Sequence, residues 1–140
     1  MATITKDRSV TLRLTRPEKA ALEAAATLTG QPPGTLAAIY VKEGVKRSRF
    51  PSIEFRDGAP GRVAYVTGTR WPVWMVVELV EDLGGNMAKA AKRLEKPEPV
   101  VRMALAYAEA YPEEIAASLA LHAHRDYEGL KAVSPGLEKL

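Results

Sequence analysis

Apolar and polar residues alternate strictly over residues 9–15. The apolar positions are Val10, Leu12 and Leu14, and the polar positions are Ser9, Thr11, Arg13 and Thr15. A period of two that includes β-branched residues predicts a strand, because successive side chains of a strand point to opposite faces. One face of this strand would be buried, and the other would meet solvent or a ligand.

The hydrophobic period becomes that of a helix directly after this segment. Thr15 and Glu18 have the spacing of a capping box, and Pro17 falls in the first turn, where its missing N–H costs nothing. Gly30 is placed to end the helix in a left-handed conformation. After a break rich in Pro and Gly, a second helix is predicted over residues 33–47.

A lone strand followed by two helices lacks a hydrogen-bonding partner. The same strand of a second copy can supply one, since antiparallel self-pairing is compatible with a twofold axis. We therefore predict an obligate homodimer. Its shared core is predicted to contain Val10, Leu12, Leu14, Leu22, Leu36, Ile39 and Tyr40.

The rest of the chain predicts a small β-hairpin followed by helices. Short strands are expected at residues 53–55 and 62–66, on either side of turn signals at Arg56-Asp57-Gly58 and Ala59-Pro60-Gly61. Helices are expected at about 73–83, 87–95, 100–111 and 113–125. The predicted fold class is mainly α, with one domain at residues 1–49, a second at 53–125 and a loose tail at 126–140.

Composition and charge narrow the function classes. The chain is 46% hydrophobic and 26% charged, as in globular proteins, and has no cysteine. No apolar run is long enough to span a membrane, and residues 1–7 lack the apolar stretch of a signal peptide, so we expect a cytoplasmic protein. Residues 1–50 hold nine Lys and Arg against four Asp and Glu, a net charge of +5, which leaves −2 for the remainder of a chain of net charge +3. A basic first part is typical of phosphate binding.

The polar face of the predicted strand has the chemistry to read DNA. A two-stranded ribbon fits the major groove, where Arg13 can donate two hydrogen bonds to guanine and Thr11 can contact base edges or a thymine methyl. Alternatively, this face is only solvated. The immediate succession of two helices within a basic segment favours DNA reading.

Residues 8–48 resemble the ribbon-helix-helix repressors, the group of Arc, MetJ, CopG and ParD. The resemblance lies in Val10-Thr11-Leu12-Arg13-Leu14, Pro17-Glu18 and Gly30. It implies that Ser9, Thr11 and Arg13 read bases, and that Arg8 and the backbone of Gly34 and Thr35 contact DNA phosphates. The Pro32-Pro33 pair departs from the family pattern and removes two N–H groups.

Residues 53–120 resemble a domain of unknown function, the four hundred and thirty-third such family, found in VapB-type antitoxins. The matching pieces, in order, are Gly61-Arg62, Gly68-Thr69-Arg70, Val73-Trp74, Ala104-Leu105-Ala106-Tyr107 and Pro112-Glu113-Glu114-Ile115. The resemblance implies a β-hairpin leading into a homeodomain-like bundle of three or four helices, and a toxin partner with a PIN-like nuclease fold. Trp71 stands where an aliphatic residue is usual.

Four basic residues are candidates for toxin binding: Arg62, Arg70, Arg125 and Lys131. Arg62 and Arg70 flank the hairpin, where a structural salt bridge or a cap is the alternative. Arg125 and Lys131 could fill an acidic nuclease site, because Arg and Lys pair well with carboxylates.

Other features allow more than one interpretation. Lys89, Lys92, Arg93 and Lys96 could mark a second DNA contact or a solvated face. Trp71 and Trp74 belong either to the edge of the core or to a partner contact. His122 and His124 are two residues apart on a helix and make a poor metal pair. We find no catalytic constellation, and we expect no metal, no cofactor and no enzymatic activity.

These patterns together predict a type II antitoxin that binds operator DNA as a dimer, represses its own operon and neutralises a PIN-like ribonuclease. The alternative is a stand-alone ribbon-helix-helix regulator whose second domain senses a ligand or builds higher oligomers. A scaffold with no role on DNA is a third interpretation.

Overall fold

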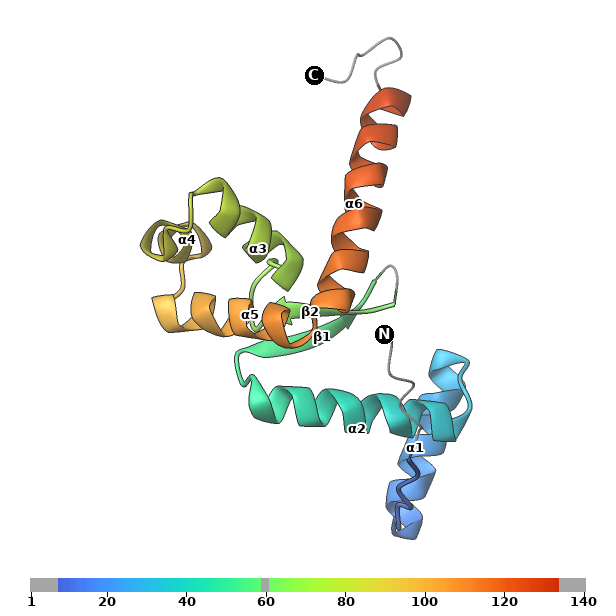
Figure 1. Cartoon of the computed structure of the whole chain (residues 1–140). Coiled ribbons are helices and arrows are strands. Elements are labelled where there is room, and N and C mark those ends of the chain that lie inside the picture. Colours follow the sequence, from blue (N-terminus) through green and yellow to red (C-terminus); the bar gives the residue numbers. More distant parts are fainter. Residues whose placement is uncertain (1–7, 59–60, 134–140) are drawn as a thin grey trace. The chain divides into compact units, whose positions relative to one another are not determined.

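The computed structural model describes residues 8–58 and 61–133, and side-chain surroundings up to Ala123 (Figure 1). The described chain is mainly helical and contains one small antiparallel hairpin. Its elements in order are α1 (Arg16–Thr29), α2 (Pro33–Arg49), β1 (Ile53–Asp57), β2 (Arg62–Val66), α3 (Val73–Asp82), α4 (Met87–Leu94), α5 (Glu98–Ala110) and α6 (Pro112–Val133).

The chain divides into two compact units, and the division falls inside α2, between Lys42 and Glu43. The sequence pattern places its boundary after residue 49 instead. The difference has a physical reason, since Glu43, Lys46 and Phe50 all contact residues of the second unit. The end of α2 therefore belongs to the same unit as the hairpin.

In the first unit, α1 is built as its sequence predicts. Thr15 is the N-cap of a complete capping box, and Gly30 ends the helix at φ 67°, a left-handed conformation suited to glycine. Residues 8–15 form neither helix nor strand in this chain, so the predicted strand is not confirmed. A strand of this kind requires a second one to pair with.

In the second unit, β1 pairs with β2 from Ile53 opposite Val66 to Asp57 opposite Arg62. The strand thus runs through Arg56 and Asp57, where a turn was predicted, because both residues still have partners on β2. Figure 1 shows the hairpin leading into α3 to α6. The side chains with the least exposure are those of Ile53, Val66, Val73, Val76, Ala90, Val101, Ala104 and Tyr107.

Several helix boundaries differ from the predicted ones, most of them by one or two residues. Helix α5 begins at Glu98, before the predicted Val100, since Pro99 is tolerated in a first turn. Helix α6 continues to Val133, so the predicted end near Arg125 is wrong. Part of the predicted tail is therefore helical. No helix in the described part of the chain has the length and apolar character needed to cross a bilayer.

Candidate nucleic-acid interface

The capping box fixes how the chain enters α1. The Thr15 amide donates to Glu18 Oε1 at 2.9 Å, and the Glu18 amide donates to Thr15 Oγ1 at 3.3 Å. The hydrogen bond from the Thr15 backbone, followed by that of its side chain, holds the pKa of Glu18 below its ordinary value. Two reciprocal hydrogen bonds therefore set the geometry at the start of α1, where residues 8–14 join the helix.

The apolar side of residues 10–14 borders a groove of about 500 Å³ between α1 and α2. Its lining includes Leu12, Leu14, Leu22, Ala25, Ala37 and Tyr40. Leu12 is 51% exposed and Leu14 is 41% exposed in the single chain. Of the other predicted dimer-core residues, Leu36 is buried, Leu22 and Ile39 are half-buried, and Val10 and Tyr40 are exposed. A groove with this apolar lining is a suitable surface for a second copy to cover.

The predicted base-reading residues, Ser9, Thr11 and Arg13, are all exposed, as is Arg8. Arg13 also lines a second hollow of the first unit, which Gly34 shares. The structure thus brings a predicted base reader and a predicted phosphate contact to one concavity. Gly34 and Thr35 lie in the first turn of α2, where helix geometry leaves N–H groups without an intrahelical acceptor.

Arg62 is held by acidic residues within the second unit. It donates to Glu43 Oε1 and Oε2, each at 2.8 Å, and to Asp57 Oδ1 at 3.0 Å. The bond to Glu43 raises the pKa of Arg62 further above its ordinary value. These contacts tie the hairpin to the end of α2, as the salt-bridge interpretation of Arg62 requires.

The other candidate toxin contacts have different surroundings. Arg70 is exposed in the loop between β2 and α3. Arg125 and Lys131 belong to α6, but their side chains lie outside the described residues. His124 is outside them as well, whereas the His122 ring stacks on Trp74 with centroids 4.2 Å apart. Trp74 is buried and Trp71 is half-buried.

A polar network that the sequence pattern did not reveal lies beside the core. The Tyr107 hydroxyl donates to the Glu114 carboxylate, with its oxygen 2.8 Å from Oε1, and Lys46 Nζ lies 3.2 Å from Oε2. The ammonium of Lys46 also lies over the Tyr111 ring, 4.5 Å from its centroid. The three-residue spacing from Val101 through Ala104 to Tyr107 is the signal that could have placed Tyr107 in the core.

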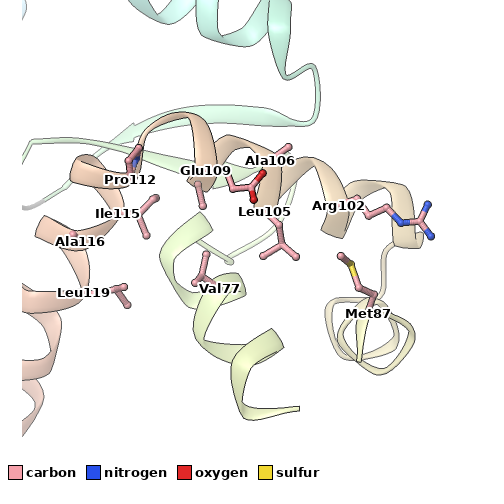
Figure 2. Close-up of a pocket in the computed structure, with 11 residues that line it drawn as sticks. Val77, Met87, Arg102, Leu105, Ala106, Glu109, Pro112, Ile115, Ala116 and Leu119 are labelled. Carbon is pink, nitrogen blue, oxygen red and sulfur yellow. The ribbon is translucent and has the colours of Figure 1, made fainter. Parts of the chain in front are cut away.

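The second unit also carries an apolar groove of about 660 Å³, which the sequence did not predict. Figure 2 shows Val77 of α3 and Leu105 of α5 facing it from two helices, with Ile115 and Leu119 on α6. Arg102 and Glu109 are the charged residues of its lining. Its size and apolar character suit a protein side chain or a small apolar ligand.

Helix α4 divides into an apolar and a basic face. Ala90, Ala91 and Leu94 are buried, whereas Lys89, Lys92 and Arg93 are exposed and line a shallow hollow beside Leu83. Among the described residues, no cluster of His, Cys, Asp and Glu could hold a metal ion.

Comparison with known proteins finds no matching family model, and neither the curated proteins nor the solved structures contain a significant match. The two family resemblances of the sequence therefore stay predictions.

Proposed function

We propose that this chain is the antitoxin of a type II toxin–antitoxin pair. In this proposal residues 1–49 form a ribbon-helix-helix homodimer that binds operator DNA and represses the chain's own operon in the cytoplasm. The second unit, a hairpin with a homeodomain-like helical bundle, neutralises a partner ribonuclease with a PIN-like fold. The chain itself has no catalytic role.

One observation carries the DNA-binding half of the proposal. Leu12 and Leu14 are exposed beside an apolar groove, while Thr11 and Arg13 alternate with them. Covering the leucines with the same segment of a second copy would remove apolar surface from water and pair two strands. It would also present two copies of Thr11 and Arg13 on one polar surface, as a major-groove ribbon requires.

The test uses the full chain and duplex DNA from upstream of its gene, with a scrambled duplex as competitor. Thr11→Ala together with Arg13→Ala should lose preferential binding while the protein stays dimeric, since each lost base contact costs about 1–3 kcal/mol. Arg13→Lys keeps the charge but not the two-pronged hydrogen bond, so it should lose preference and retain most non-specific binding. Arg70→Ala is the matched control outside the first unit.

A footprint that persists in the Thr11 and Arg13 double variant would show that this segment is not the reader. Loss of the dimer in that variant would instead assign the two residues to assembly.

The toxin half rests on the resemblance of residues 53–120 and on the apolar groove of the second unit. The test is co-expression with the protein encoded by the neighbouring gene, followed by co-purification and an assay of that protein's ribonuclease activity. Co-purification with loss of nuclease activity is expected. A neighbouring protein that neither binds nor cleaves RNA would overturn this half.

The same groove favours one alternative, a stand-alone regulator that senses an apolar ligand through its second unit. Its volume of about 660 Å³ is within the range of small-molecule sites. A regulator of this class would bind operator DNA without a toxin gene beside it, and a ligand would shift its operator affinity.

A further inference from the structure

The outer face of α4 is a basic surface that the proposed function does not use. Lys89, Lys92 and Arg93 are spaced three and four residues apart, so they share one side of the helix. The opposite side carries Ala90, Ala91 and Leu94, which are buried in the core. The buried alanines and leucine fix the rotation of α4, and the three cations are thereby turned outward.

These cations are not engaged in ion pairs within the described part of the chain. Its salt bridges involve Lys46, Arg56, Arg62 and Arg102 instead. The α4 segment itself contains no Asp or Glu. The hollow that the three cations line is completed by Leu83, an apolar residue. A concave surface with three positive charges that form no ion pair in the described part of the chain is complementary to phosphate groups.

Helix stability does not explain the whole set. Lys92 and Arg93 occupy the last turn, where positive charge is favourable beside the helix carbonyls. Lys89 occupies the N3 position, where its amide donates to the Asn86 side chain at 3.0 Å. A cation is unfavourable at this end of a helix dipole, and Glu is the usual N3 residue. Lys89 therefore opposes local helix electrostatics while extending the basic surface.

The following helix argues against base reading by this helix pair. In a helix-turn-helix the second helix enters the major groove with its N-terminal residues. In α5 those residues include Glu98, whose carboxylate pairs with Arg102 at 3.6 Å. A carboxylate at that position repels phosphates. It also forms an ion pair with the only arginine of the helix, Arg102.

We propose that Lys89, Lys92 and Arg93 of α4 form a second DNA contact, which binds phosphates of the duplex without reading its sequence. The inference rests on the proposed function, because the ribbon of the first unit brings the chain to its operator. Contacts of this kind add affinity and salt dependence but no sequence preference.

The experiment measures the salt dependence of binding by the full chain. Association constants for the upstream duplex and for a scrambled duplex of equal length are determined from about 50 to about 200 mM salt. The test variant is Lys89→Gln with Arg93→Gln, and Gln keeps helix propensity at these exposed positions. Arg70→Gln with Arg102→Gln is the control, because it removes the same charge from the same unit outside α4.

The test variant should lower the steepness of log K against log salt by about 2 for each second unit that touches the duplex. Affinity for both duplexes should fall by the same factor, so the preference for upstream DNA stays. The control should leave the slope unchanged, and Lys89→Arg with Arg93→Lys should retain the wild-type slope. A common unfolding midpoint shows that all variants are folded.

An unchanged slope in the test variant, or an equal change in the control, would overturn the inference. A variant that keeps its DNA slope but no longer binds the partner protein would assign the basic face to that partner and would overturn it as well. Failure of the proposed function is recognised separately. In that case the wild type shows no preference for the upstream duplex. The salt slope on scrambled DNA, compared between wild type and the α4 variant, still shows whether α4 contacts phosphates.

Discussion

The Tyr107 hydroxyl donates a hydrogen bond to the Glu114 carboxylate across seven residues of sequence, from the last turn of α5 to the first turn of α6. Lys46, near the end of α2, contacts the same carboxylate. One acidic group therefore joins three helices of the second unit. A buried hydroxyl bound to a charged acceptor is among the stronger hydrogen bonds of a fold.

Replacing Tyr107 by Phe should destabilise the protein by about 1–2 kcal/mol, since it removes the donor and leaves the partly buried Glu114 short of one partner. Urea unfolding at fixed protein concentration measures the change. Tyr65→Phe is the matched control, because the Tyr65 hydroxyl makes no hydrogen bond among the described residues, and the Arg56 guanidinium contacts its ring. If both variants lose the same free energy of unfolding, the hydrogen bond from Tyr107 to Glu114 makes no special contribution to stability.

Alkaline pH should weaken the fold through the same residue. Burial, and then the bond to Glu114, raise the pKa of Tyr107 well above its ordinary value of 10.0. Above pH 10 the unfolded chain loses this proton while the folded chain keeps it. The stabilisation is therefore complete below pH 10 and falls as pH rises, by up to about 1.4 kcal/mol per pH unit.

Unfolding free energies measured between pH 9 and pH 11 test this expectation, and Tyr107→Phe should show a shallower decline than wild type. Identical pH profiles would mean that Tyr107 does not hold its proton more tightly in the folded protein.

Neighbouring substitutions in the N-terminal segment should separate assembly from DNA reading. Leu12→Asn should weaken the proposed dimer, because two leucines, one per copy, lose roughly 3–6 kcal/mol of apolar burial. That loss corresponds to a rise of about 100-fold or more in the dimer dissociation constant. Thr11→Asn, on the opposite face, should stay dimeric and change only DNA binding. Analytical ultracentrifugation measures both, and a dimer that tolerates Leu12→Asn contradicts the shared ribbon.

Two adjacent alanines of α6 test the groove of the second unit. Ala116 lines this groove, and Ala117 is exposed but does not line it. Ala116→Glu should weaken binding of the partner protein at least about tenfold, because docking would bury an unpaired carboxylate. Ala117→Glu adds the same charge to the same helix and should bind as wild type. Calorimetric titration with the partner gives both constants, and equal affinities would exclude the groove from the interface.

Local patterns predicted much of the secondary structure. The capping box at Thr15 and Glu18 and the left-handed Gly30 depend only on residues a few positions apart, and both are present in the structure. The hairpin was likewise expected from two short apolar runs around turn residues, and its strands pair as expected. The predicted end of α6 was wrong because the isolated Gly129 does not stop the helix, and the next stop signal along the sequence is Pro135.

The sequence by itself determined where α1 begins and ends, because a capping box and a left-handed glycine act over a few residues. It also determined the alternation of Thr11 and Arg13 with apolar neighbours. Only the tertiary structure decided that Arg62 pairs with Glu43 and that Tyr107 shares Glu114 with Lys46. Such pairs join residues from different elements, and their distances depend on how those elements pack, which no local pattern encodes.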